Sequence, residues 1–161
     1  DFFFRKIVKD HGQSMTALSM QIAQFAKDLG AQGGALDAER EALGKAMENI
    51  QAIVGYMAGA AFQSDPRTGG NLTNLYKVGQ NSTRLLLGAG DLIVGWLLLR
   101  QAEVATAALA AGAKGKDADF YTGKIAAAKF FTHQVLPRLA AERAMAESTD
   151  LSLMEVPEGA F

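Results

Sequence analysis

Four long stretches of this chain carry apolar side chains at alternating spacings of three and four residues, the spacing of one helix face. No stretch shows the two-residue alternation of a half-buried strand. The sequence therefore predicts an all-α fold: an up-down antiparallel bundle of about four long helices, 2–29, 37–63, 72–111 and 117–147, with a short C-terminal tail. The apolar series are Met15, Leu18, Ile22, Phe25 and Leu29; Leu43, Met47, Ile50, Val54, Met57 and Ala61; Leu85, Ala89, Leu92, Trp96 and Leu99; and Tyr121, Ile125, Ala128, Phe131, Val135 and Leu139.

Glycine and polar clusters mark the ends of the first two helices. Gly30 and the Gly33-Gly34 pair terminate the first helix, and the segment 64–71 (SDPRTGGN) is the clearest loop in the chain. Asp37 is the expected N-cap of the second helix. The tail is short, and four of its apolar residues are able to dock on the bundle: Leu151, Leu153, Met154 and Val156.

Two further positions interrupt predicted helices. The His11-Gly12 pair marks a bend or a break, and a break leaves 1–9 as a separate short helix. Pro137 has no backbone N–H to donate, so it kinks the fourth helix or starts a new helical segment at Leu136.

The third predicted helix has an unusual centre. Gly88, Gly90 and Gly95 each cost about 1 kcal/mol relative to alanine in a helix, so we expect a neighbouring helix to approach closely there. The apolar run 85–99 is shorter than the roughly 20 residues that a membrane span needs, and Asp91 interrupts it. We therefore interpret this run as a buried core helix rather than a membrane contact.

Asp91 and the two histidines are the candidate functional side chains. As a functional residue, Asp91 would be a general base or the partner of a buried cation. We favour a structural interpretation, in which Asp91 lies at the outer edge of the helix or pairs with Arg84 or Lys124. His11 and His133 lack a second histidine or a carboxylate at the spacing of a helical metal site. We expect both histidines to occupy surface or cap positions.

No motif in the chain completes an active site. The glycine-rich segments 30–34 and 68–70 do not follow strands, which indicates turns rather than phosphate-binding loops. The chain has no cysteine, and its net charge of −1 argues against nucleic acid as a partner and against an anionic membrane surface. We predict no catalytic, cofactor-binding or metal-binding residue in this chain.

The chain opens on Asp1 followed by three phenylalanines, Phe2, Phe3 and Phe4. Three neighbours on a helix cannot all face one core, so some of them are expected to meet a second surface. Because the sequence also begins without a methionine, we expect it to be a piece of a longer protein that covers this surface.

Several motifs occur in a recognisable order. They are a Phe-Tyr-x-x-Lys segment at 120–124, a His-x-Val-Leu-Pro-Arg segment at 133–138 and a Met-x-x-Pro-Glu-x-x-Phe ending at 154–161. Together they resemble the C-terminal extension of one branch of the acyl-CoA dehydrogenase family, the bacterial branch that includes 3-methylmercaptopropionyl-CoA dehydrogenases. The opening DFFFRKI is similar to the last helix of that family's catalytic core. The resemblance implies a core stub at 1–9 and a helical-bundle extension at 10–161.

The resemblance also implies a function for the parent protein. That parent is a longer, FAD-dependent and cytoplasmic enzyme of fatty-acid or related acyl-CoA oxidation. It converts an acyl-CoA to the 2,3-enoyl-CoA, with a glutamate removing the α-proton and the flavin N5 accepting the β-hydride. The glutamate, the acyl-CoA cleft and most flavin contacts belong to the part that precedes this chain, so we expect no FAD on this chain alone.

The role implied for the chain itself is structural: it extends the subunit, covers the core and contributes to contacts with a second subunit. The alternative is a stand-alone helical module that self-associates through the Gly88, Gly90 and Gly95 surface or through 2–4. Peripheral binding of an amphipathic face to a membrane is the weakest alternative, since no face is basic.

Overall fold

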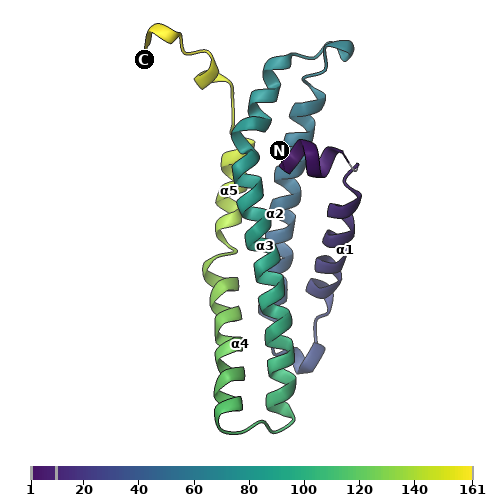
Figure 1. Cartoon of the computed structure of the whole chain (residues 1–161), viewed down its shortest axis with the longest axis vertical. Helices are drawn as coiled ribbons and strands as arrows, with labels where there is room; N and C mark the ends of the chain where they lie inside the picture. Colours follow the sequence, from purple (N-terminus) through teal and green to yellow (C-terminus); the bar gives the residue numbers. More distant parts are fainter. Residues whose placement is uncertain (1, 10, 161) are drawn as a thin grey trace.

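The computed structural model of the chain describes residues 2–9 and 11–160, and it confirms the all-α up-down bundle. Successive helices run antiparallel to one another, and α5 continues the column of α4 beside α3 (Figure 1). No strand occurs in these two described ranges. The helices are α1 (Gln13–Lys27), α2 (Asp37–Phe62), α3 (Leu75–Ala110), α4 (Lys116–Gln134) and α5 (Arg138–Glu147).

The first predicted helix is broken where the sequence indicates. A short π-helix, η1 (Phe2–Val8), is separated from α1 by His11 and Gly12, whose φ angles are 56° and 74°. η1 lies against α1 and α3, and the Phe3 side chain is 2% exposed. Phe3 therefore contributes to the core, whereas the side chains at positions 2 and 4 lie outside the described set.

The turn between α1 and α2 corrects one prediction. Leu36, not Asp37, is the N-cap residue of α2, and its side chain is only 2% exposed. Asp37 is the first helical residue, and its Oδ1 accepts a hydrogen bond of 2.9 Å from the backbone N–H of Gly30. The carboxylate thus joins the end of α1 to the start of α2, while its charge still favours the helix N-terminus.

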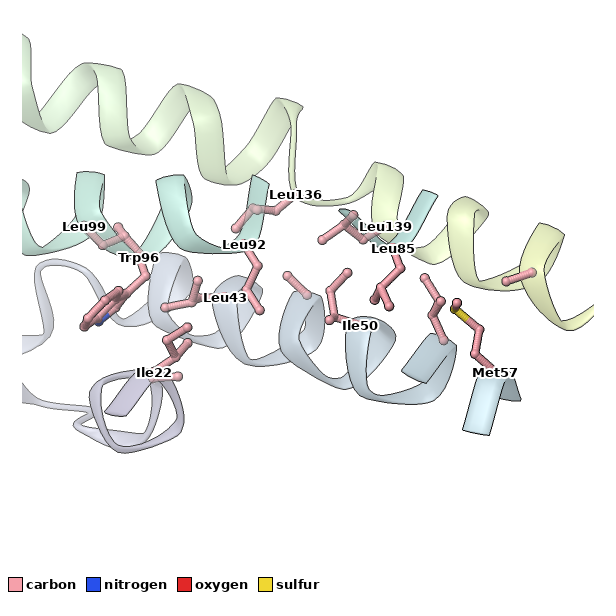
Figure 2. Close-up of a cluster of buried hydrophobic side chains, with 14 of the residues drawn as sticks. Ile22, Leu43, Ile50, Met57, Leu85, Leu92, Trp96, Leu99, Leu136 and Leu139 are labelled. Carbon is pink, nitrogen blue, oxygen red and sulfur yellow. The ribbon is translucent and has the colours of Figure 1, made fainter. Parts of the chain in front are cut away.

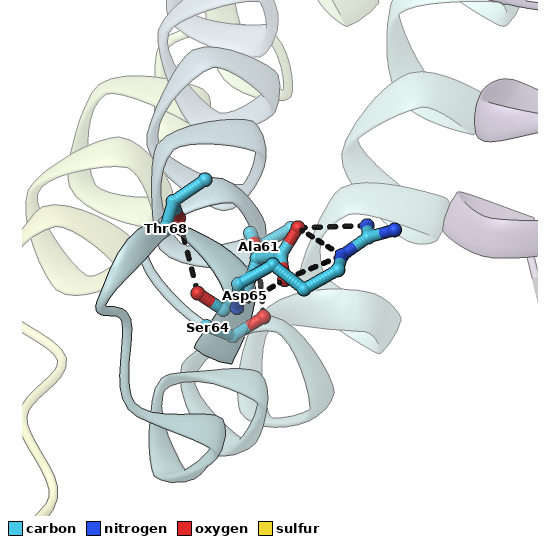
Figure 3. A network of polar contacts seen from close by, with 5 residues as sticks. Ala61, Ser64, Asp65 and Thr68 are labelled. Carbon is cyan, nitrogen blue, oxygen red and sulfur yellow. Dashed lines mark hydrogen bonds and ion pairs between the residues drawn. The ribbon is translucent and has the colours of Figure 1, made fainter.

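The turn between α2 and α3 is held by a local polar network (Figure 3). The Ser64 hydroxyl donates to the carbonyl of Ala61 at 2.6 Å, and the Thr68 hydroxyl donates to the carbonyl of Asp65 at 3.0 Å. The Asp65 carboxylate accepts from the backbone N–H of Arg67 and pairs with its guanidinium. These hydrogen bonds with Arg67 hold the pKa of Asp65 below its ordinary value.

Most residues of the apolar series meet in one core between α2, α3 and the α4–α5 column (Figure 2). Leu29, predicted to share this face, follows the end of α1 and is 50% exposed. Each leucine-sized side chain buried there stabilises the fold by roughly 1.5–3 kcal/mol relative to leaving it in water. The core residues with 5% exposure or less include Leu43, Ile50, Met57, Leu85, Leu92, Leu99, Leu136 and Leu139. The predicted inner faces of α2 and α3 are therefore confirmed.

Two of the three central glycines of α3 lie in close contact with side chains of other segments. A Cβ at Gly88 would lie 2.8 Å from Ile50 Cδ1, and a Cβ at Gly95 would lie 3.0 Å from Leu136 Cδ1. The close approach expected from the sequence is confirmed there. At Gly90 the expectation is wrong within this chain, because no heavy atom lies within 4 Å of the position of a Cβ.

Pro137 ends the long fourth helix as expected. α4 stops at Gln134, and Pro137 is the N-cap residue of α5. α5 therefore starts at Arg138, two residues after the predicted start at Leu136. The docking of the C-terminal tail is a wrong prediction: Leu153 and Met154 are 73% and 47% exposed, and the tail leads away from the bundle (Figure 1). Its 3-10 turns of three residues each are too short to present an apolar face.

One helical stretch of the described residues, Leu72–Ala110, contains an 18-residue window whose mean hydropathy of 1.4 is high enough for a membrane span. A single stretch of this kind is also typical of a helix buried in a bundle. One side of α3 lies in the core at Leu85, Leu92 and Leu99, in agreement with the interpretation of 85–99 as a core helix.

Candidate functional site

Asp91 lies at the edge of α3 and forms a surface ion pair. Its Oδ2 lies 3.2 Å from Nη2 of Arg138 on α5, and the two side chains are 32% and 65% exposed. The predicted edge position is confirmed, but both predicted partners are wrong. Arg84 instead pairs with Glu142, and Lys124 donates to the side-chain oxygen of Gln101.

His133 lies on the surface of α4, as predicted. It contacts a carboxylate of α2 that is far from it in the sequence. Its Nε2 lies 2.9 Å from Oε1 of Glu39, and the two side chains are 47% and 5% exposed. Lys129 Nζ approaches the same oxygen at 4.0 Å. His11 is exposed and forms the left-handed break before α1. No group of three or more metal-ligating side chains occurs in the described part of the chain.

Arg40 is the most buried charged residue that the sequence analysis missed. It is 1% exposed and joins three helices: Nη1 donates to the carbonyl of Phe25 at 2.6 Å, and Nη2 pairs with Oε1 of Glu103 at 2.7 Å. Its guanidinium also lies 4.1 Å from the centre of the Phe25 ring. The available signal was its spacing, since Arg40 occupies the apolar series of α2 three residues before Leu43.

Tyr56 connects α2 to the beginning of the C-terminal tail. Its hydroxyl donates to the carbonyl of Thr149 at 2.7 Å. Burial, and to a smaller extent the charge of Asp150, raises the pKa of Tyr56 above its ordinary value. The Asp150 carboxylate accepts from Ser152, which lowers its own pKa. These groups fix the root of the tail and do not face a cleft that binds substrate.

Two clefts lie beside α1. The first, of about 610 Å³, lies between α1, α2 and α3, and no charged side chain lines it. The second, of about 620 Å³, lies between α1 and α3, and its charged lining residues are Asp28, Arg100 and Glu103. A flavin dinucleotide needs positive charge or helix N-terminal N–H groups at its pyrophosphate. The second cleft has two carboxylates beside one arginine and does not fit that requirement.

The sequence is similar to those of known proteins along almost its whole length. A family described as "Acetyl-CoA dehydrogenase C-terminal like" matches residues 18–157. The chain belongs to this family. The resemblance stated from its motifs is thereby confirmed, and the helical bundle described above is the C-terminal domain that acyl-CoA dehydrogenases of this kind carry.

Three relatives illustrate the range of this acyl-CoA dehydrogenase family. The broad-specificity linear acyl-CoA dehydrogenase FadE5 of Mycobacterium tuberculosis is 48% identical over the whole of this chain and 26% of its own length. The 3-methylmercaptopropionyl-CoA dehydrogenase of Ruegeria pomeroyi is 30% identical over 96% of this chain and 24% of its own length. A butyryl-CoA dehydrogenase of Syntrophomonas wolfei is 40% identical over half of the chain and 13% of its own length. The chain thus spans about a quarter of the length of the first two.

Proposed function

We propose that this chain is the C-terminal accessory domain of an FAD-dependent enzyme that oxidises an acyl-CoA to the 2,3-enoyl-CoA. The observation that carries the proposal is the alignment of 96–100% of the chain with about a quarter of two longer acyl-CoA dehydrogenases. Residues 1–9 would belong to the last helix of the catalytic core, and 10–161 to the extension. The break at His11 and Gly12, which separates η1 from α1, supports a boundary at that point.

The chemistry of the proposed enzyme takes place outside this domain. Acyl-CoA dehydrogenases are flavoproteins, and the bound flavin supplies the acceptor for the hydride that leaves the acyl chain. We assign no catalytic, flavin-binding or metal-binding role to the described residues and derive no step through the cofactor. The residues described here position one another, through contacts such as Arg40 with Glu103.

The choice of acyl group is also made elsewhere in the protein. Relatives with similar C-terminal domains are named for linear acyl, 3-methylmercaptopropionyl and butyryl groups. A domain shared by enzymes with such different substrates fits a structural role better than a specificity role. Its partners would be the preceding catalytic part and a second subunit, in a cytoplasmic homo-oligomer without nucleic acid.

The test uses the longer protein of which we propose this chain to be the end. That protein should bind flavin, and its absorbance near the flavin maximum should fall when an acyl-CoA is added under anaerobic conditions. Deletion of 10–161 should lower the thermal stability and change the oligomeric state. The chain expressed alone should be colourless; a flavin spectrum on it, or a longer protein without flavin, would contradict the proposal.

A further inference from the structure

α3 presents a second apolar face on the outside of the bundle. With 3.6 residues per turn, six residues lie on one arc about 100° wide, the usual width of a helix face that packs against a core. Five of them are large apolar side chains with 44–65% exposure, and the sixth is Gly90. We call this set the α3 outer stripe: Leu86, Leu87, Gly90, Val94, Leu97 and Val104.

Gly90 lies at the centre of the α3 outer stripe without a neighbour that explains it. Gly88 and Gly95 are each in close contact with an apolar side chain of α2, the α4–α5 connection or α5. Nothing lies within 4 Å of the Cβ position of Gly90. Glycine in the middle of a helix is intrinsically unfavourable, and close approach of another backbone is a recurring reason for its presence. Other helical glycines, such as Gly55 and Gly79, are equally open, so the open position alone indicates no partner. Gly90 differs from them in lying among five exposed large apolar side chains, and a neighbour there would come from outside the described residues.

A hollow of about 590 Å³ continues the α3 outer stripe toward α4, and it includes Leu97, Val104 and Phe120. The two basic residues at this hollow are engaged within the chain. Lys124 donates to Gln101, and Arg100 lies 5.5 Å from the centre of the Trp96 ring. The surface therefore has an apolar hollow into which a side chain can pack, and the α3 outer stripe itself contains no charged residue.

The occupant follows from the position of η1. Because Phe2–Val8 lies against α1 and α3, a polypeptide that precedes it would run next to α3. The first two relatives have about three quarters of their length outside the region that matches this chain. We propose that an apolar helix of the preceding part of the same polypeptide docks on the α3 outer stripe and approaches α3 most closely at Gly90. This inference rests on the proposed function.

Cysteine accessibility in the full-length protein tests the docking. The chain has no cysteine, so Val94→Cys and Leu97→Cys each introduce one site here, read by mass spectrometry of the labelled peptide. Lys45→Cys, on the exposed polar side of α2, is the matched control. Maleimide should modify the two stripe cysteines roughly 100-fold more slowly than the control in the native protein, and equally fast after unfolding.

Three results would overturn the docking proposal. The first is reaction of the stripe cysteines as fast as the control. The second is protection only at concentrations where two copies associate, and the third is protection only when lipid vesicles are present. The first result would show that the α3 outer stripe is uncovered. The second would show that another copy of the protein covers it, and the third that a lipid surface does. Protection that is unchanged on dilution and needs no vesicles supports the docking of the protein's own upstream helix.

A pair of glycine substitutions gives a second measurement. Gly90→Ala and Gly55→Ala both occur inside long helices where the added Cβ meets no atom of this chain, so their gain in helix propensity is the same. Gly90→Ala should lower the melting temperature of the full-length protein, whereas Gly55→Ala should raise it or leave it unchanged. Equal increases for both variants would contradict a close approach at Gly90.

The same samples separate this inference from the proposed function. Flavin content and acyl-CoA oxidation are measured on the protein used for labelling. A flavin-loaded, active enzyme with a freely reactive α3 outer stripe removes only the docking proposal. A protein without flavin whose stripe is protected removes the proposed function and leaves the docking of an upstream helix standing.

Discussion

The two sides of α3 have similar side chains in opposite surroundings. On the inner side Leu85, Leu92 and Leu99 are 0–5% exposed, whereas on the outer side Leu87 and Leu97 are 65% and 45% exposed. The helix is apolar around most of its circumference, which is typical of a helix buried on more than one side. One face of α3 is covered by α2 and the α4–α5 column. The other face is the one on which we propose that an upstream helix docks.

The ion pairs of α3 repeat this contrast. On the inner side Glu103 pairs with Arg40, whose side chain is 1% exposed. At the outer edge Asp91 pairs with Arg138, whose side chain is 65% exposed. Removing one member of an ion pair that is shielded from water costs several kcal/mol of stability, whereas removing one member of an exposed pair costs little. Predictions about both pairs and both faces test whether the two sides of α3 differ as described.

The largest effect is expected for Arg40→Ala. The substitution leaves the carbonyl of Phe25 without its donor, removes the partner of Glu103 and creates a cavity where three helices meet. We expect the free energy of unfolding to fall by about 3 kcal/mol, measured by urea denaturation of the chain. Glu103 is 29% exposed and can regain water, which places the cost at the lower end for a broken buried pair.

Arg40→Met is the control for this change. Methionine keeps most of the volume and removes the charge, and apolar replacement of a buried ion pair is often neutral. We expect a loss clearly smaller than that of the alanine variant. An equal loss in both variants would show that the polar contacts with Phe25 and Glu103, rather than packing, determine the stability at this position.

Leu85→Ala and Leu87→Ala compare the two faces directly. Leu85 is 0% exposed and Leu87 is 65% exposed, two residues apart on the same helix. The inner substitution should cost about 2–5 kcal/mol, because it removes buried methyl groups and leaves a cavity. The outer substitution should change the unfolding free energy of this chain by less than about 0.5 kcal/mol. Similar losses would show that the outer face is already packed in the chain alone.

The sequence predicted the local features of this fold better than its long-range contacts. Helix spacing, the His11-Gly12 break and the end of α4 near Pro137 depend on neighbours within one or two turns. The partners of Asp91 and Arg40 lie 47 and 63 residues away, and they depend on how each helix is rotated and displaced along its neighbour. The apolar periodicity of a single helix shows which face is buried, but it does not show how that helix is rotated against its neighbour.

The glycines show the same limit. The sequence indicated that the cost of Gly88, Gly90 and Gly95 in a helix must be offset by close packing. It did not show which of the three glycines faces the bundle. Gly88 and Gly95 face the bundle, while Gly90 is rotated onto the opposite side. That the chain holds no complete site stays a prediction from the lack of motifs. The buried Arg40 and Glu39 were missed because their partners come from other helices.

A smaller effect of defined sign is expected for Gly88→Ala. The new Cβ would lie 2.8 Å from Ile50 Cδ1 and 3.1 Å from Leu139 Cδ2, so these side-chain ends must move. Overpacking of about 1–3 kcal/mol is partly offset by the higher helix propensity of alanine, which leaves a net loss of about 1 kcal/mol. In the chain alone Gly90→Ala should instead raise the unfolding free energy, and a gain at Gly88 would mean that the contact is looser than described.

The smallest effect is expected for Asp91→Asn. The pair with Arg138 joins α3 to α5, but both side chains reach water and Arg138 is 65% exposed. Exposed pairs of this kind contribute about 0–1 kcal/mol, and salt screens them, so the difference between the variant and the parent chain should shrink further in 1 M NaCl. A double-mutant cycle with Arg138→Ala measures the coupling. A coupling of about 3 kcal/mol that persists in high salt would place Asp91 among the buried contacts of α3 and would remove the contrast between its inner side and its edge.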